Sequence, residues 1–218
     1  MAQLLAVNED HIARRAGVNI KVKQALVRDV NRGRQVDYSI PLTTRVEDVL
    51  DDPEIQVVVE VMGGQEPAFT YIMEALQRGK HVVTANKDLL ATHGKELFAA
   101  AKEAGVDIYF EASAGGGIPI IRPLKNCLAG NRIEKVYGIV NGTTNYIMTQ
   151  MDHGDTYEAA LKQAQEHGFA EADPSADVRG LDAARKIAIL ASIAFSARVR
   201  ANDVTCVGIQ DLEPLDLA

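Results

Sequence analysis

The sequence predicts an α/β fold, in which a parallel sheet carries helices on both faces and is followed by an α+β region. β-branched apolar runs alternate with stretches of helical periodicity through the first half of the chain, a pattern typical of βαβ units. Residues 57–62 are apolar except for Glu60, which is expected of a strand whose sheet is covered on both faces. From about Asn141 the alternation stops, so the sequence divides into a doubly wound first part and a second region.

Each predicted element of the first part has its own pattern. Five stretches are predicted to be strands: residues 20–28, 57–62, 81–84, 106–111 and 135–140. Two stretches between them have apolar residues at helical spacing: Phe69, Ile72, Met73 and Leu76, then Leu97, Ala100, Ala101 and Ala104. Gly79 and Gly105 follow these helices at the point where a left-handed C-terminal cap favours glycine.

The second region contains two predicted helices and a short predicted strand. Residues 157–166 form the first helix, and a loop with Asp173-Pro174 leads to a long helix from Leu181 to about Phe195. Residues 204–209 are predicted to be a strand. We therefore expect an incomplete nucleotide-binding domain over 1–125 and a second, incomplete region over 126–218.

Both ends of the chain are unusual for a dinucleotide-binding unit. Such a unit begins with a strand, a G-x-G-x-x-G loop and a helix whose N-terminus faces the pyrophosphate. Residues 1–5 instead have the pattern of the latter half of a helix, and residues 210–218 end just after the last predicted strand. We expect a chain cut at both ends, although a natural short relative would have the same pattern.

Composition excludes several classes of protein. The 218 residues suffice to bury a core, and 23 Lys+Arg against 30 Asp+Glu give a formal charge of −7, which disfavours nucleic acid as a partner. No apolar run reaches the length of a membrane span and no signal segment opens the chain, so we expect no membrane and a cytoplasmic location. Cys127 and Cys206 are too few for a disulfide framework or a zinc site.

Two turns follow neighbouring predicted strands and are candidates for a ligand site. Gly63-Gly64 follows the strand 57–62, and residues 84–87, which end in Asn86-Lys87, follow the strand 81–84. Ligands of open α/β sheets collect at the carboxyl ends of strands, where glycine lets the backbone approach a bound molecule. Lys87 would add a positive charge or a proton donor. On spacing alone, a turn glycine pair and a solvated lysine explain the same residues.

Residues 111–119 contain three successive glycines between a predicted strand and a predicted helix. Their backbone groups would cradle an anion at the helix N-terminus or offer carbonyls to a hard cation, with Glu111 as a carboxylate ligand. The simpler alternative is a flexible loop.

Residues 141–145 gather small polar side chains at the end of the predicted strand 135–140. Gly142, Thr143 and Thr144 suit hydrogen bonds to a small polar ligand. An N-cap, with Thr143 or Thr144 starting a helix, is the structural alternative, and the two roles are compatible.

An acidic segment precedes the long second-region helix. Glu171, Asp173 and Asp177 lie within twelve residues of Asp182, and Asp182 and Lys186 lie four apart on one helix face. Such a pair is usually an exposed ion pair that contributes little. Here the same helix has a fully apolar stripe, so a partly buried Lys186 beside Asp182 is a candidate acid of tuned pKa.

Taken together and in this order, these motifs resemble those of the homoserine dehydrogenases. The matching segments are Gly63-Gly64 with Pro67-Ala68, 84–87, 111–119, 141–147, 168–174 and 177–186. The resemblance covers residues 4 to 212, and the last two segments together are highly specific. It implies a Rossmann-like fold and NAD- or NADP-dependent interconversion of L-aspartate 4-semialdehyde and L-homoserine, on the threonine and methionine branch of amino-acid biosynthesis.

The resemblance also implies a role for individual residues. Lys186 corresponds to the proton-donating lysine, and Lys87 to a second lysine near cofactor and substrate. Glu171 and Asp182 correspond to carboxylates that hold the substrate's amino group. A monovalent cation site, for Na⁺ or K⁺, corresponds to Glu111 with the carbonyls of Ala114, Gly116 and Ile118. Arg28 lies where an NADP 2′-phosphate is met, beside the cofactor-side residues Gly63, Gly64, Asn86 and Lys87.

The sequence departs from the family pattern at both ends, and each departure predicts a property of the chain. Without the glycine loop we expect weak cofactor binding and little activity from this chain alone, and sheet edges left unpaired should favour a homodimer or homotetramer. Two rivals stay open: a non-catalytic fragment or pseudoenzyme that folds and pairs with other chains, and a Rossmann oxidoreductase that acts on a different semialdehyde.

Overall fold

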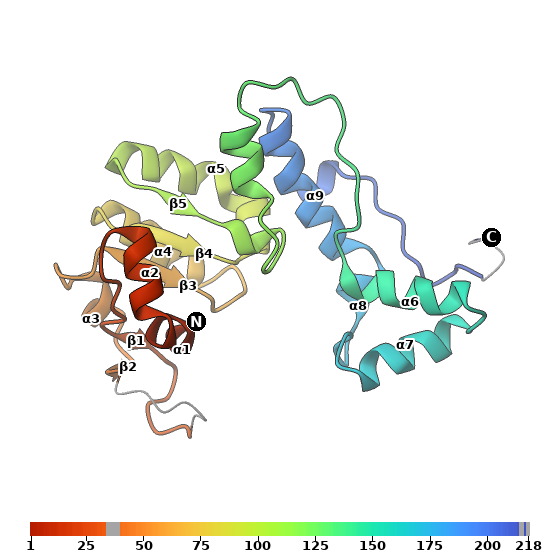
Figure 1. Ribbon diagram of the computed structural model, residues 1–218, viewed down its shortest axis with the longest axis horizontal. Coiled ribbons are helices and arrows are strands. Elements are labelled where there is room, and N and C mark those ends of the chain that lie inside the picture. The colour runs from red at the N-terminus through yellow and green to blue at the C-terminus, as the bar shows by residue number, and fades with distance from the viewer. Residues whose placement is uncertain (34–39, 214–215, 217–218) are drawn as a thin grey trace.

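The computed structural model describes residues 1–33, 40–213 and 216, and its first part is built on parallel strands (Figure 1). The strands are β1 (Ala25–Leu26), β2 (Leu42–Thr43), β3 (Val57–Glu60), β4 (His81–Thr84) and β5 (Ile108–Tyr109). β1 pairs with β2, and the other three form a sheet in the order β3-β4-β5, all parallel. The predicted α/β class with a parallel sheet is therefore confirmed.

The helices of the first part connect these strands. They are α1 (Ala2–Val7), α2 (Glu9–Ala16), α3 (Glu47–Leu50), α4 (Ala68–Gln77) and α5 (Lys87–Ala104), with a 3-10 turn η1 (Glu111–Ser113) and a π-helical turn η2 (Pro123–Cys127). The predicted glycine caps are confirmed, because Gly79 follows α4 with φ +73° and Gly105 ends α5 with φ +68°. The sequence pattern predicted the end of a helix at the start of the chain but not the second helix, α2.

The faces of the three-stranded sheet differ in burial. Val82 and Ile108 lie in a core with residues of α4 and α5, and this core also holds Ile189 and Leu190 from the distant helix α9 (Leu181–Ala194). On the other face Val57 is 49% and Tyr109 60% exposed. Burial within the described residues therefore does not account for the apolar side chains on the exposed face of β3, Val57 and Val59.

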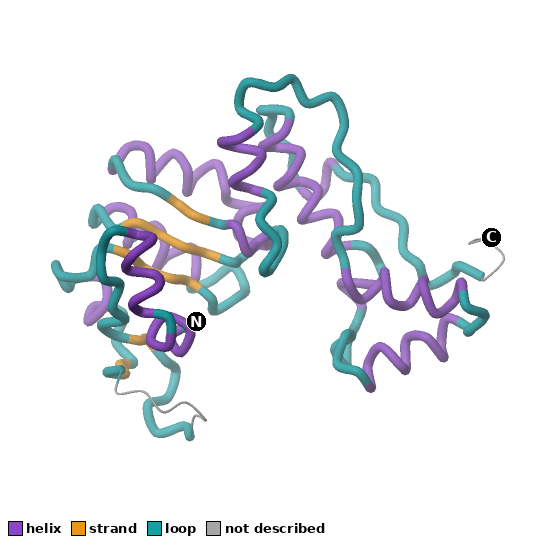
Figure 2. The backbone as a smooth tube through the Cα atoms, viewed as in Figure 1, coloured by secondary structure: helices purple, strands orange, loops and turns teal. Residues whose placement is uncertain are grey.

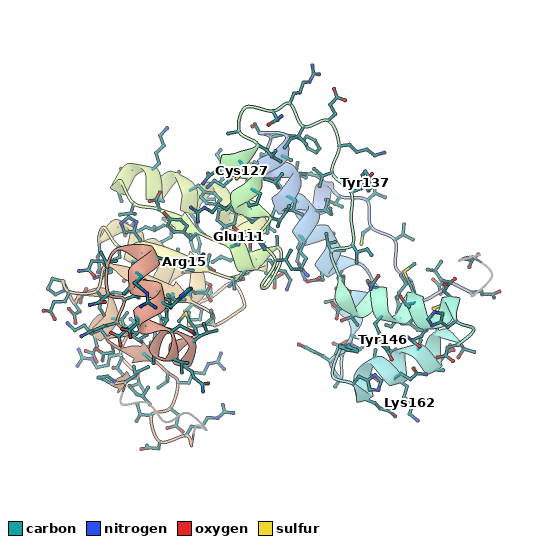
Figure 3. All side chains as sticks on the ribbon, viewed as in Figure 1. Arg15, Glu111, Cys127, Tyr137, Tyr146 and Lys162 are labelled. Atoms are coloured by element: carbon teal, nitrogen blue, oxygen red, sulfur yellow. The ribbon has the colours of Figure 1, made fainter. Side chains whose placement is uncertain are left out.

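Two predicted strands are not strands in the structure. Residues 135–140 and 204–209 form no ladder with any described strand. The side chains of Tyr137, Ile139 and Val207 are 78% to 84% exposed. Their β-branched and aromatic residues favour an extended strand, but the backbone groups of a strand also need a pairing partner. The described residues do not supply one. Figure 3 shows Tyr137 on the long segment that leads away from the sheet.

The regular secondary structure in the described part of the second region is helical, with long loops between the helices (Figure 2). It comprises α6 (Gly142–Asp152), α7 (Tyr157–Glu166), α8 (Ser175–Val178), α9 and the 3-10 turn η3 (Ala201–Asp203). The predicted helix 157–166 is confirmed, and the long helix ends one residue before the predicted position. Residues 214–215 and 217–218 of the predicted second region lie outside the described residues.

Two hydrophobic clusters hold the regions together. The smaller one lies between α6, α7 and α8, and contains Ile147, Met151, Ala160, Ala164, Ala170 and Val178. Helix α9 packs along α5 and joins the larger cluster, so it connects the α6–α7 hairpin with the sheet (Figure 1). Within the described part of the chain, no helix combines the length and apolarity that crossing a bilayer requires.

Candidate active site

Two lysines from different helices converge on one buried carboxylate. Asp182, in the first turn of α9, is 6% exposed. The Nζ of Lys186, one turn along α9, lies 2.7 Å from Asp182 Oδ2, and the Nζ of Lys87, at the start of α5, lies 3.2 Å from Oδ1. Lys186 is four positions from Asp182 in the sequence, but Lys87 is 95 positions away. The fold therefore creates the cluster by bringing the starts of α5 and α9 together.

The packing of α5 against α9 fixes this arrangement. A second ion pair joins the same two helices, with Arg185 Nε 2.9 Å from Asp88 Oδ1. Gly180, with φ +77°, starts α9, and the carboxylate of Asp182 in the first turn interacts favourably with the helix dipole. Asp182 therefore lies at a helix N-terminus and between two cations.

The ammonium group of Lys186 has a donor to spare. A lysine ammonium has three N–H donors. Lys186 gives one to Asp182 and one to the backbone carbonyl of Val140, 2.9 Å away. Because Lys186 also lines the adjacent cavity, its remaining donor is available to a molecule bound there.

Asn141 connects the carboxylate cluster to the start of α6. Its Oδ1 accepts from the Thr144 backbone N–H at 2.8 Å, so it is the N-cap of α6. Its Nδ2 donates to Asp177 Oδ1 at 2.7 Å and to Asp182 Oδ2 at 2.8 Å. The prediction that Thr143 or Thr144 starts this helix is wrong, because the asparagine one turn earlier has the side chain that reaches the free N–H.

Competing effects set the pKa of Asp182. Burial alone raises it, because a carboxylate loses hydration. Hydrogen bonds from Lys186, Asn141 and Lys87, together with the charge of Lys186, outweigh burial and hold the pKa of Asp182 below its usual value. The group is therefore ionised at neutral pH and keeps both lysine contacts.

A cavity of about 660 Å³ opens beside this cluster. Its lining joins α6, the turn after α7 and the starts of α8 and α9: Asn141, Gly142, Thr143, Asn145, Tyr146, Thr149, Gly168, Phe169, Asp177, Asp182 and Lys186. The lining includes the aromatic rings of Tyr146 and Phe169, 4.9 Å apart between centroids, and the charged groups of Asp177, Asp182 and Lys186. A small molecule with a cationic group and a polar, reactive end fits this distribution.

The predicted substrate residues are placed unevenly around the cavity. Gly142 and Thr143 line it, whereas Thr144 lies outside the lining and donates to Asn141. Glu171 is exposed and outside the lining. Sequence reasoning did not assign Asp177 or Phe169, although both lie in segments that it quoted.

A second cluster joins the turns that follow β3 and β4. The buried carboxylate of Glu60 accepts from the Met62 and Gly63 N–H groups at 2.7 and 3.2 Å and from the Thr84 hydroxyl at 2.6 Å. Asn86 donates to the Gly64 carbonyl at 2.6 Å. The two predicted turns are thus connected at the carboxyl ends of the strands.

Other predicted residues of the cofactor side lie around this edge. Asn86 also accepts from Leu89 and so starts α5, directly before Lys87. Gly63 and Gly64 both have φ +74°, a conformation that glycine allows. Arg28 is exposed, two residues after β1.

The predicted cation ligands lie in one loop, where Glu111 has another structural role. Its carboxylate accepts backbone N–H groups of Ile120, Ile121 and Arg122 at 2.5 to 2.9 Å, which caps the helical turn that begins there. A carboxylate has about four acceptor positions, so one remains. No described residue donates to the carbonyls of Ala114, Gly116 and Ile118. These oxygen donors suit a hard monovalent cation, so the residues fit such a group.

Two family models match this chain, one over each of its two parts. Residues 2–111 match the family model described as "Homoserine dehydrogenase, NAD binding domain", and residues 119–218 match "Homoserine dehydrogenase". The chain belongs to the homoserine dehydrogenase family. It is 50% identical to the Homoserine dehydrogenase of Bacillus subtilis and 51% identical to that of Synechocystis, over 100% and 91% of this chain.

Solved structures of this family agree with the fold. The homoserine dehydrogenase of Thiobacillus denitrificans superposes with a TM-score of 0.93 at 46% identity, over 98% of this chain and 50% of its own. A hyperthermophilic archaeal homoserine dehydrogenase in complex with NADPH gives a TM-score of 0.71 at 26% identity, over 95% of this chain and 60% of its own. The chain spans about half the length of the curated relatives it matches, 51% of the Bacillus subtilis protein and 46% of the Synechocystis protein.

Proposed function

We propose that this chain forms the nucleotide-binding part and the catalytic cluster of a homoserine dehydrogenase that interconverts L-aspartate 4-semialdehyde and L-homoserine. The observation that carries the proposal is the convergence of Lys186 and Lys87 on Asp182 at the wall of a polar cavity. Membership of the family supports the reaction class, and the cluster supports the roles of the residues.

Lys186 is the proposed acid. A bound nicotinamide supplies the hydride when the aldehyde is reduced and accepts it in the reverse direction. As hydride reaches the aldehyde carbon, the carbonyl π electrons move to oxygen, which takes a proton from the Lys186 ammonium group. The ammonium both stabilises the growing negative charge and neutralises it by proton transfer. In the oxidation of homoserine the amine form of Lys186 takes the hydroxyl proton.

The carboxylates orient the substrate. Asp182 holds the two lysines in place, and with Glu171 it would attract the cationic α-amino group, which fixes the face of the aldehyde that receives hydride. Gly142 and Thr143 line the cavity and would offer hydrogen bonds to the substrate, and Thr144 would act next to them. Lys87 would contact substrate or cofactor between the two regions.

The turns after β3 and β4 are the proposed cofactor edge. The glycines at 63 and 64 and the amide of Asn86 present backbone and amide groups where ligands of open α/β sheets bind. Arg28 would meet a 2′-phosphate, and the choice between NADP and NAD stays open. A Na⁺ or K⁺ ion held by Glu111 and the three carbonyls would stiffen the loop between β5 and η2.

The assembly and the division of the chain are further parts of the proposal. Residues 1–125 would bind nucleotide, and residues 126–218 would bind substrate and pair with a second copy to give a homodimer or homotetramer. The exposed apolar side chains of Tyr137, Ile139 and Val207 support pairing in the second region. A cytoplasmic location fits the substrates and cofactors proposed.

A steady-state assay tests the function. L-homoserine with NAD⁺ or NADP⁺ is given to the 218-residue chain and to a version extended to the length of the relatives. We expect homoserine-dependent reduction of the cofactor by the extended version and little or none by the shorter chain. Absence of turnover in both would favour a non-catalytic protein, and faster turnover of a different hydroxy amino acid would favour the other semialdehyde.

A further inference from the structure

The side chain of Asn141 combines an N-cap with a bridge between two acids. Its amide orientation is fixed by chemistry, because the Thr144 backbone N–H is only a donor and must face Oδ1. The amide nitrogen must then face Asp177 and Asp182, whose ionised carboxylates only accept. Reversing the amide would place oxygen against oxygen on one side and N–H against N–H on the other.

We propose that Asn141 is a positioning residue that holds the carboxylate of Asp177 beside that of Asp182 without adding a charge, so that Asp177 can receive the ammonium group of the substrate. The inference rests on the proposed function. Both acids line the cavity, and Asn141 itself is 7% exposed. Among the described residues, Asn141 is the one side chain that donates a hydrogen bond to Asp177.

A neutral donor suits this position better than a charged one. A lysine or arginine between the two acids would cancel their charge and compete with the cationic end of an amino-acid substrate. The asparagine amide gives each acid one hydrogen bond and adds no charge, so it leaves the negative charge of Asp177 uncompensated. Lys186 and Lys87 already compensate Asp182, whereas Asp177 has no cation within ion-pair distance among the described residues. Asp177 is therefore the acid that is open to the substrate.

The groups around Asp182 determine what losing the bridge should do. Lys186 faces it from its own helix, Lys87 from α5, and Asn141 from the start of α6, with Asp177 beyond the amide. Without the amide, the like charge of Asp177 would stay nearby while one hydrogen bond to Asp182 is lost. The pKa of Asp182 should then rise, because its charged form loses a donor.

Two substitutions separate positioning from capping. Asn141→Ser keeps an N-cap side chain for α6 but is too short to bridge the acids. Thr156→Ala is the matched control, because Thr156 caps α7 by accepting from Ala159 and does not line the cavity. Carboxyl-carbon NMR follows the Asp182 titration in the 218-residue chain, and kinetics on the extended version follow homoserine.

We expect Asn141→Ser to keep α6 capped, to titrate Asp182 at higher pH and to lose the matching part of its stability at neutral pH. It should raise the KM for homoserine on the order of 10- to 100-fold with a smaller change in kcat, as for the loss of a hydrogen bond to a charged group. Thr156→Ala should lower the unfolding temperature and leave the titration and the KM unchanged.

An unchanged titration and KM in Asn141→Ser would overturn the inference, and so would an equal rise of KM in Thr156→Ala. If the wild-type extended version turns over no homoserine, the proposed function fails and the substrate role of Asn141 fails with it. If the wild-type extended version turns over homoserine but the Asp182 titration in Asn141→Ser equals that of the wild type, the inference about Asn141 fails and the proposed function stands.

Discussion

Replacing Gly180 with alanine tests how the start of α9 is built. Gly180 has φ +77°, a conformation that costs an ordinary residue about 1–2 kcal/mol. A Cβ at this position would lie 2.7 Å from Cys206 Sγ and 3.2 Å from the Val207 carbonyl oxygen. Overpacking of this kind costs about 1–3 kcal/mol. We therefore expect Gly180→Ala to lower the free energy of unfolding by about 2–5 kcal/mol.

Gly17→Ala is the matched control. Gly17 has φ +74°, but its added Cβ would meet no atom within 4 Å, so only the conformational cost of about 1–2 kcal/mol applies. Urea unfolding measures both variants, and Cys206→Ala in the Gly180→Ala background should recover part of the loss because it removes the closest atom. Equal losses in the two glycine variants, or no recovery in the double variant, would refute the reasoning.

Three further predictions concern the site and the loops around it. Asp182→Asn should lower the free energy of unfolding at neutral pH by about 1–3 kcal/mol. The depressed pKa of Asp182 gives stability that is present above pH 3.8, the ordinary pKa of the group, and is lost as the pH falls through the folded-state pKa. Urea unfolding in strong acid should therefore show a smaller difference between the variant and the wild type. Asn86→Ala removes the cap of α5 and the bond to Gly64, so it should cost about 1–2 kcal/mol and weaken binding of NADPH, measured by calorimetry. Glu111→Gln should destabilise the chain by about 1 kcal/mol and abolish any activation by K⁺ or Na⁺ in the extended version, whereas activation that persists in this variant would contradict the proposed cation site.

Local patterns in the sequence predicted where most elements of the first part lie, but not every length. The strands predicted over 20–28, 57–62 and 106–111 span only 25–26, 57–60 and 108–109 in the structure. The strand 81–84 and the helix 157–166 have the predicted bounds, because β-branched runs and helical patterns are properties of neighbouring residues. The stretches 135–140 and 204–209 failed because a strand depends on a partner far along the chain. No local pattern contains that partner.

The site was predictable in residue types more than in contacts. The i, i+4 spacing of Asp182 and Lys186 placed them on one helix face, and the structure joins them at 2.7 Å. The contact of Lys87 with Asp182 depends on the packing of α5 against α9, which no spacing along the chain reveals. The bridge by Asn141 was not predicted, because the sequence pattern gave the start of this helix to Thr143 or Thr144, whereas both ends of the Asn141 amide are used in the structure.

The most direct test of the central claim is a comparison of two lysines in matched helical pairs. Lys186 pairs with Asp182 at i, i+4 inside the site, and Lys162 pairs with Glu166 at i, i+4 on the exposed face of α7, outside the cavity lining (Figure 3). In the extended version, Lys186→Met should lower kcat for homoserine oxidation by about 100-fold or more, as for the loss of a general acid–base group, while Lys162→Met should leave it unchanged. A Lys186→Met enzyme with wild-type kcat would contradict the assignment of this ammonium group as the proton donor.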